Sequence, residues 1–177
     1  MNDTEFLDSV IRRVPDHPKK GILFYDITGI LVDPKAFSLC VDRMVEHCQG
    51  VGATAVSGVE ARGFLFAAPI AKIMGIPLVL VRKKGHLPGK TFSCKYSLEY
   101  GEAEVEVHAS DITAGQKVIV IDDLIATGGT LAAGRTVLEQ GGAKVIGYLG
   151  VLGLPMLGYA EKLAPLPVKT LITYDHE

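Results

Sequence analysis

The stretch Val118–Thr130, VIVIDDLIATGGT, joins an apolar run to two aspartates and a glycine-rich turn. Its first four residues are β-branched, and such a run predicts a strand that is buried on both faces, as in a parallel sheet. Asp122 and Asp123 stand where we expect this strand to end. Because ligands of parallel α/β sheets bind at the carboxyl ends of the strands, the stretch predicts both the fold class and the position of a ligand site.

The rest of the chain alternates between helix and strand patterns. The spacing of apolar residues predicts helices at 4–14, 34–49, 63–75, 130–140 and 156–164, and strands at 53–59, 77–83, 117–122, 144–152 and 168–174. Residues 91–109 alternate differently and predict an antiparallel excursion with a turn near Gly101. We therefore expect an α/β fold with a central, mostly parallel sheet flanked by helices, in a single domain spanning residues 1–177.

Composition narrows the class of protein. The chain has 177 residues, of which 48% are hydrophobic and 21% charged, as is typical of a soluble globular protein. A net charge of −2 argues against a general nucleic-acid or membrane-surface binder. The three cysteines form no CxxC pair, the start lacks the pattern of a signal peptide, and no uncharged stretch reaches the ~20 residues of a spanning helix. We expect a cytoplasmic protein with no nucleic-acid or membrane partner.

The turn after the aspartates has the chemistry of a phosphate site. Glycine-rich turns at helix N-termini bind phosphate through exposed N–H groups and the helix dipole, and carboxylates accept hydrogen bonds from sugar hydroxyls. The alternative is an aspartate that only caps the helix, with glycines that only form a turn. The whole run favours a phosphorylated sugar, with its ribose on Asp122 and Asp123 and its phosphate on Ala126, Thr127, Gly128, Gly129 and Thr130.

The same run resembles the phosphoribosyl diphosphate (PRPP) signature of the type I phosphoribosyltransferases. Four more stretches, KGILFYDITGIL, GVEARGFLFAAPIA, VRKKGHLPGKT and YSLEYG, are similar to the adenine phosphoribosyltransferases in matching order. The resemblance runs from Pro15 to about Gly142. It implies a type I fold with a small N-terminal hood and a flexible catalytic loop, a homodimer, and purine salvage, in which adenine and PRPP give AMP and diphosphate.

Two strand ends supply cations for the diphosphate. The guanidinium of Arg62, in EARG, is placed to bind diphosphate oxygens, with help from the N–H of Ala61. The resemblance implies a diphosphate loop here, with a cis peptide before Ala61. The alternative for Arg62 is a surface ion pair with Glu60. In RKKG, Lys83 is our choice for the diphosphate, and Arg82 serves the same site or a neighbouring subunit. For the following residue, Lys84, the alternative is that it belongs to a solvated basic cluster on the surface.

Glu99, between Leu98 and Tyr100, is the candidate general acid or base. The resemblance places it on the mobile loop, in contact with the base near N7. The alternative is an exposed hairpin carboxylate, as we expect in part for the nearby Glu102, Glu104 and Glu106. Asp122 and Asp123 complete the catalytic set, because their charge opposes the positive charge of an oxocarbenium-like transition state.

The resemblance also implies the adenine site. Phe24 stacks on the purine, the backbone of Leu23 and Tyr25 reads its edge, and Leu124 or Ile125 covers its other face. Phe24 as an ordinary core residue is the competing interpretation. Many members carry a basic residue where Tyr25 stands, so a side-chain contact there is left open.

The sequence offers no protein-held metal site. Its five histidines show no ligand spacing, so the metal is expected to arrive with the substrate as Mg²⁺ bridging diphosphate and ribose oxygens. Two other functions stay open: transfer to a 6-oxopurine, and a PRPP-sensing regulator of nucleic acid. The regulator would need a DNA-binding appendage or a basic face, neither of which the sequence indicates.

Overall fold

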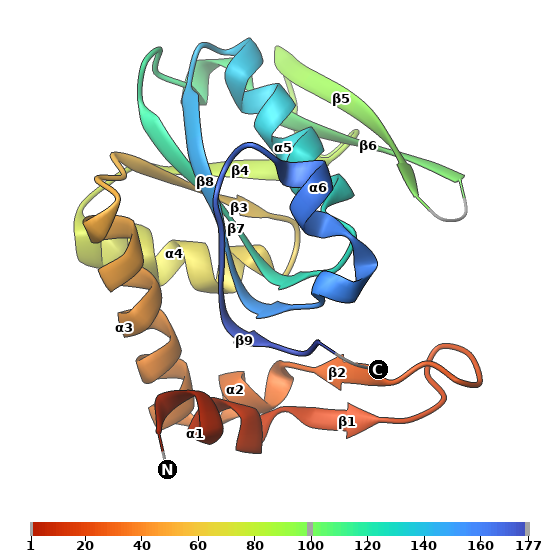
Figure 1. Ribbon diagram of the computed structural model, residues 1–177. Helices are drawn as coiled ribbons and strands as arrows, with labels where there is room; N and C mark the ends of the chain where they lie inside the picture. Colours follow the sequence, from red (N-terminus) through yellow and green to blue (C-terminus); the bar gives the residue numbers. More distant parts are fainter. Residues whose placement is uncertain (1, 99–100, 176–177) are drawn as a thin grey trace.

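A computed structural model describes residues 2–98 and 101–175, and its centre is a seven-stranded sheet (Figure 1). In spatial order the strands are β5 (Thr91–Leu98), β6 (Gly101–His108), β4 (Leu78–Lys83), β3 (Ala55–Val59), β7 (Lys117–Ile125), β8 (Lys144–Gly153) and β9 (Val168–Thr173). The five strands from β4 to β9 in this order pair in parallel, whereas β6 is antiparallel to both β4 and β5. The predicted mostly parallel sheet and the antiparallel excursion are confirmed.

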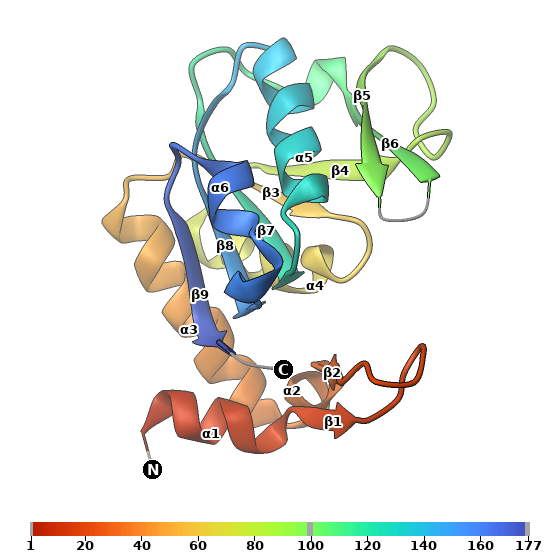
Figure 2. The same cartoon turned by 45° about the vertical axis from the view of Figure 1, so that its right-hand side comes forward.

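Helices cover both faces of this sheet (Figure 2). On one face lie α3 (Pro34–Gly50) and α4 (Gly63–Met74), and on the other α5 (Gly129–Gln140) and α6 (Tyr159–Leu163). The β7 residues Ile119 and Ile121 pack in the core on the α4 side, and Val118 and Val120 pack in the core on the α5 side. The unbroken apolar run of β7 is therefore buried on both faces, as the sequence predicted.

A small N-terminal layer lies beyond the carboxyl ends of the strands (Figures 1 and 2). It consists of α1 (Asp3–Val10), β1 (Arg12–Val14), β2 (Phe24–Asp26) and α2 (Thr28–Val32), and it is the expected hood. The helix predicted at 4–14 is wrong in its last turn, because residues 12–14 pair antiparallel with β2. Arg12 stands opposite Asp26 and forms an ion pair with it at 3.1 Å. Asp26 is too far along the chain for the spacing of residues within 4–14 to indicate this pairing.

β7 runs further than the predicted strand at 117–122. Its pairing with β3 stops at Ile121, but its pairing with β8 continues from Asp122, opposite Gly150, to Ile125, opposite Gly153. The two aspartates are therefore not at the end of the strand. They lie inside β7 just beyond its last pair with β3, so that this side of the strand is open to a ligand.

Two short 3-10 turns complete the fold, at Ala109–Asp111 and Pro155–Leu157. The second turn and α6 together replace the single helix predicted at 156–164, because Gly158 has a φ of 76° between them and breaks the helix. Within residues 2–98 and 101–175, no helix combines the length and the apolar character needed to cross a membrane.

Candidate active site

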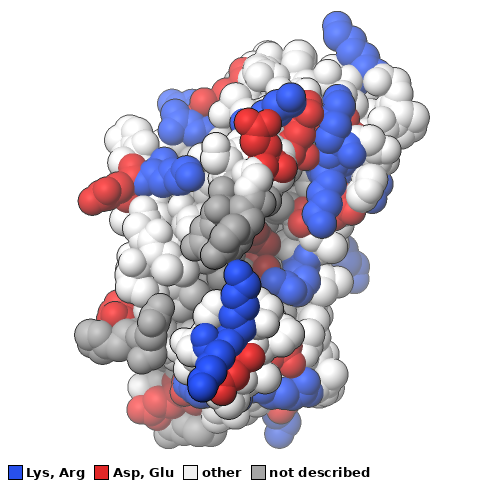
Figure 3. Space-filling view, turned by 90° about the vertical axis from the view of Figure 1, so that its right-hand side faces the viewer, with Lys and Arg blue, Asp and Glu red and all other residues white. Residues whose placement is uncertain are grey.

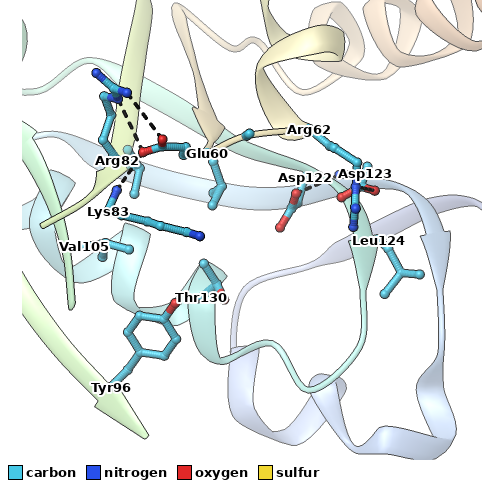
Figure 4. A pocket seen from close by; sticks show the side chains of 13 residues that line it. Glu60, Arg62, Arg82, Lys83, Tyr96, Val105, Asp122, Asp123, Leu124 and Thr130 are labelled. Carbon is cyan, nitrogen blue, oxygen red and sulfur yellow. Dashed lines mark hydrogen bonds and ion pairs between the residues drawn. The ribbon is translucent and has the colours of Figure 1, made fainter. Parts of the chain in front are cut away.

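A cavity of about 410 Å³ lies at the carboxyl ends of β3, β4 and β7 (Figure 4). It is lined by Val59, Glu60, Ala61, Arg62, Val81, Arg82, Lys83, Tyr96, Val105, Asp122, Asp123, Leu124 and Thr130. All four residues predicted to bind diphosphate line it, and so do both residues predicted to bind ribose. Strands that are far apart in the sequence thus bring these two groups together.

Arg62 and Asp123 form one wall of the cavity. The Arg62 Nε donates to Asp123 Oδ2 at 2.5 Å, and the Asp123 side chain is only 5% exposed (Figure 4). Arg62 is half-exposed. The ion pair weighed as the alternative for Arg62, with Glu60, is wrong, since the partner in the structure is Asp123. The sequence placed these two side chains in different subsites, and the fold joins them.

Asp122 is held between β7 and the start of α4. Its Oδ1 accepts the backbone N–H of Asp123 at 2.9 Å. A Cβ built at Gly63 would lie 2.6 Å from the carbonyl oxygen of Ile121 and 3.3 Å from Asp122 Oδ1, so only glycine lets α4 begin this close to β7. Burial and the neighbouring Asp123 raise the pKa of the Asp122 carboxyl well above its usual value.

Glu60 organises the opposite wall. It accepts hydrogen bonds from Arg82, through Nε and Nη2 at 3.3 Å, and from the backbone N–H of Lys83 at 2.9 Å, and it contacts His86 Nδ1 at 2.9 Å. Burial alone would raise the pKa of Glu60, but these bonds hold it below its usual value. The peptide bond between Glu60 and Ala61 is cis, as the resemblance implied.

The two adjacent lysines of RKKG point in different directions. Lys83 extends into the cavity (Figure 4). Lys84 instead turns to Glu106, and its Nζ lies 3.1 Å from Glu106 Oε2. Lys84 therefore has a buried carboxylate partner on β6, where the sequence left open a solvated basic cluster.

Glu106 corrects the expectation of a solvated hairpin carboxylate. It is 1% exposed, and its Oε1 accepts the backbone N–H groups of Gly85, His86 and Leu87 at 2.8–3.0 Å. Three donors on consecutive residues fix the turn that follows Lys83. Glu106 therefore holds the turn beside the Lys83 wall of the cavity in shape from the base of the β5–β6 hairpin.

We expect Glu106→Ala to lower the free energy of unfolding at pH 7 by about 1–3 kcal/mol, because three N–H groups lose their acceptor. Burial alone would raise the pKa of Glu106, but the hydrogen bonds from Leu87, Lys84 and Gly85 lower it. A lowered folded-state pKa gives stability that is present above the unfolded value of about 4.3 and lost as the pH falls through the folded value. Urea unfolding at pH 7 and near pH 4 should therefore show a loss that shrinks in acid.

The matched control is Glu102→Ala, on the same strand but exposed, which should change stability by less than about 0.5 kcal/mol. Equal losses for the two variants at pH 7 would contradict the role of Glu106.

The predicted phosphate turn closes a second, smaller cavity of about 90 Å³, lined by Asp122 and residues 124–131. α5 begins at Gly129, and its cap Gly128 has a φ of 76°, which favours glycine. The Thr130 hydroxyl donates to the Tyr96 hydroxyl at 3.3 Å, so strand β5 reaches the turn. All five residues predicted to hold the 5-phosphate lie in this turn, with their N–H groups at the start of the helix.

Tyr96 was not singled out from the sequence. It lines the large cavity, and its hydroxyl points toward Thr130 (Figure 4). A signal was present, because Phe92, Cys94 and Tyr96 alternate along β5 and pack together against the α5 side of the core.

The residues predicted to bind adenine divide into two groups. Leu124 lines both cavities, and Ile125 is 1% exposed and lines only the small one. Leu23, Phe24 and Tyr25 lie in the hood and do not line the large cavity. Phe24 is half-buried and meets the ring of His17 edge-on at 5.0 Å.

The C-terminal end of the chain braces the hood. The rings of Tyr25 and Tyr174 stack with centroids 4.3 Å apart, and Arg13 lies over the Tyr174 ring at 5.2 Å. The Tyr174 hydroxyl also donates to Asp8. The Tyr25 side chain therefore packs against the C-terminal end of the chain and helps to hold the hood.

Glu99 lies outside the described residues. The strands on either side of it, β5 and β6, pair in one antiparallel hairpin. Figure 3 views the face that carries this hairpin above and the hood hairpin below, and Lys and Arg side chains gather on both, with Asp and Glu between them. Among the residues that the structure describes, no three His, Cys, Asp or Glu side chains are grouped to hold a metal ion.

Comparisons with known proteins agree with this geometry. Residues 43–153 match the family of the phosphoribosyl transferase domain. The adenine phosphoribosyltransferase of Treponema denticola is 63% identical over 173 residues, which cover 98% of this chain and 91% of the relative. The crystal structure of the enzyme of that name from Thermoanaerobacter pseudethanolicus has a TM-score of 0.92 and 40% identity, over 97% of this chain and 99% of that one.

A third relative was solved with ligands. The adenine phosphoribosyltransferase of Saccharomyces cerevisiae, in complex with adenine and an imino-altritol bisphosphate, has a TM-score of 0.91 and 36% identity, over 96% of this chain and 98% of that one. The predicted family is confirmed by these likenesses.

Proposed function

The chain belongs to the phosphoribosyltransferase family and, within it, to the adenine phosphoribosyltransferases, and from this premise we propose that it transfers the 5-phosphoribosyl group of PRPP to adenine. The products are AMP and diphosphate, and the reaction is a step of purine salvage. The observation that carries the proposal is that the two cavities share Asp122, Leu124 and Thr130. A ribose bound at the aspartates would thus have its 5-phosphate in the small cavity and its diphosphate in the large one.

The diphosphate is bound by residues from two strand ends. Arg62 uses its Nε for Asp123, which leaves the two terminal amino groups of the guanidinium for diphosphate oxygens. The Lys83 ammonium extends into the same space, and the backbone of Ala61 borders it. Arg82 is fixed by Glu60 at the rim, and it acts on this diphosphate or on that of a neighbouring subunit.

The two aspartates serve the ribose and the transition state. Their carboxylates accept hydrogen bonds from the 2- and 3-hydroxyls and oppose the positive charge that C1 acquires as diphosphate departs. A nitrogen of adenine attacks C1 from the opposite face. The bond from C1 to the adenine nitrogen replaces the bond from C1 to diphosphate, so no protein nucleophile is needed.

The base is held between the hood and β7. Phe24 stacks on adenine, the backbone of Leu23 and Tyr25 reads its edge, and Leu124 covers its other face with Ile125 behind it. Glu99 acts as the general acid or base toward N7. The crystal of the Saccharomyces cerevisiae relative contains both adenine and a bisphosphate, which supports binding of a base and of a sugar phosphate by one protein.

Magnesium fits this site as an ion that comes with PRPP. The two carboxylates of Asp122 and Asp123 border the cavity, and Mg²⁺ commonly takes one or two carboxylates together with phosphate oxygens and waters. When bound, the ion neutralises the diphosphate and makes it a better leaving group. Asp122 and Asp123 would hold it through the ribose oxygens and waters.

We also propose a single-domain, cytoplasmic homodimer. The exposed apolar side chains Val32, Leu65 and Ile73, which are 70%, 44% and 55% exposed, support a partner surface on the hood and α4. Sedimentation at micromolar concentration should give the mass of two chains, and a mass of one chain would contradict it.

A panel of bases tests the proposed reaction. With PRPP and Mg²⁺, adenine should release diphosphate in a one-to-one ratio with the AMP formed, and reactions without base should release far less. Release with hypoxanthine in preference to adenine would favour the 6-oxopurine alternative. Tight PRPP binding without release for any base would favour the sensing regulator.

A further inference from the structure

The 5-phosphate cavity lacks a positive side chain in its own lining. It is lined by Asp122 and residues 124–131, and the charged side chain among these is the acid Asp122. The 5-phosphate of PRPP carries up to two negative charges. Backbone N–H groups and the helix dipole offset part of this charge, but the carboxylate of Asp122 adds to it. The geometry therefore calls for a cation from outside the turn.

α6 brings such a cation to the turn. Its apolar residues anchor it there, since a Cβ built at Gly128 would lie 3.0 Å from the Leu163 Cγ and 3.3 Å from the Tyr159 Cβ. Leu163 and Tyr159 are both buried. In Figures 1 and 2, α6 lies beside the lower end of α5, where the turn begins.

The ammonium of Lys162, the residue before Leu163, lies directly at the turn. A Cβ built at Gly129 would be 3.5 Å from Lys162 Nζ. The same point would be 3.5 Å from Tyr96 Cδ2 and 3.7 Å from the carbonyl oxygen of Ser97, both on β5. The ammonium is therefore placed where the turn, α6 and the β5–β6 hairpin meet.

The Lys162 side chain is exposed, and its ammonium stands at this turn without a carboxylate partner among the described residues. The N-terminal end of α5 carries the positive end of the helix dipole, and a cation there is repelled. A phosphate in the small cavity would supply the missing negative charge.

We propose that Lys162 is a ligand of the 5-phosphate of PRPP and AMP. This assignment rests on the proposed function and adds a binding residue to it. The flexible stem of lysine lets the ammonium move the short distance from Gly129 onto a phosphate oxygen, where it donates a charge-assisted hydrogen bond.

The test is binding of ribose 5-phosphate and of free diphosphate to Lys162→Gln, measured by calorimetry. Ribose 5-phosphate and AMP should bind about 10- to 100-fold more weakly, the range of a hydrogen bond to a charged group. The KM for PRPP should rise in parallel. Diphosphate affinity and the KM for adenine should stay within about twofold, because Lys162 does not line the large cavity proposed for the diphosphate and does not lie in the hood.

Two further variants separate charge from packing. Lys162→Arg should keep most of the affinity for ribose 5-phosphate. If Lys162→Arg loses as much of this affinity as Lys162→Gln does, the proposal is overturned. Lys72→Gln, on the exposed side of α4 on the opposite face of the sheet, is the matched control and should bind like the parent.

The outcomes also distinguish this inference from the proposed function. If the parent forms AMP but Lys162→Gln binds ribose 5-phosphate as the parent does, the inference is wrong and the function stands. If the parent forms no AMP with adenine while Lys162→Gln still loses ribose 5-phosphate binding, the function is wrong and the phosphate ligand stands.

Discussion

Hypoxanthine should be used with a kcat/KM about 10⁴-fold below that of adenine, or lower. Adenine presents a 6-amino donor beside the N1 acceptor, and hypoxanthine presents a 6-oxo acceptor beside an N1 donor. If the Leu23 carbonyl faces the 6-position and the Tyr25 N–H faces N1, adenine satisfies both backbone groups. Hypoxanthine would leave both unpaired in a desolvated site, at about 1–3 kcal/mol for each group.

Side-chain changes in the hood should weaken this preference little, because backbone groups make it. Tyr25→Ala removes the stack on Tyr174 and loosens the hood, so the KM for adenine should rise while adenine stays preferred. Tyr25→Phe is the control, since it keeps the stack and should behave like the parent. Phe24→Ala should also raise the KM for adenine without reversing the choice. Comparable use of adenine and hypoxanthine by the parent, in direct competition, would refute this account of the base site.

Asp123→Asn should lower kcat by roughly 10²- to 10³-fold, the effect of removing one preorganised charge that stabilises a transition state. The variant also loses the ionic part of the 2.5 Å bond to Arg62, so the KM for PRPP should rise as well. Pre-steady-state measurement of AMP formation separates the chemical step from binding. Parent-like turnover in this variant would show that the ribose is not bound at β7.

Asp122→Asn should lower kcat to a similar degree and yet make the ligand-free protein more stable at pH 7. Burial and Asp123 raise the pKa of Asp122, so between the unfolded and folded pKa values the folded state binds more protons than the unfolded state. Stability therefore falls as the pH rises through this range. An asparagine avoids that loss and its Oδ1 can still accept the Asp123 N–H.

Thermal unfolding at several pH values measures the predicted gain in stability, and kcat measured on the same variant gives the predicted loss of activity. The midpoint of Asp122→Asn should exceed that of the parent at pH 7, and the gain should vanish below about pH 4, where the carboxyl is protonated in both states. The exposed Asp111→Asn is the matched control and should shift neither the midpoint nor kcat. A lower midpoint for Asp122→Asn at pH 7 would contradict the raised pKa.

The sequence by itself determined the features whose signals lie within a few residues of one another. The β-branched run before Asp122 predicted a strand buried on both faces, and the glycine-rich turn at 126–130 predicted the helix start that forms the small cavity. Likewise, Gly75 ends α4 with a φ of 65°, as expected for a C-terminal glycine. Such predictions succeed because backbone preference and the alternation of side chains are local properties of the chain.

Only the tertiary structure decided which side chains meet. Arg62 and Asp123 are 61 positions apart, and their ion pair depends on β3 and β7 being neighbours. The burial of Glu106 also depends on the tertiary structure. The alternation of residues along β6 predicted an exposed side chain, but the turn after Lys83 packs over it and donates hydrogen bonds to it.

The ion pair of Lys84 with Glu106 and the stacking of Tyr25 on Tyr174 likewise follow from contacts across the sheet and between the two ends of the chain. A local pattern can place a charge at a strand end. The partner that fixes its direction and protonation is set by strand order and helix packing, because hydrogen bonds and ion pairs act over a few ångströms in space and not along the sequence.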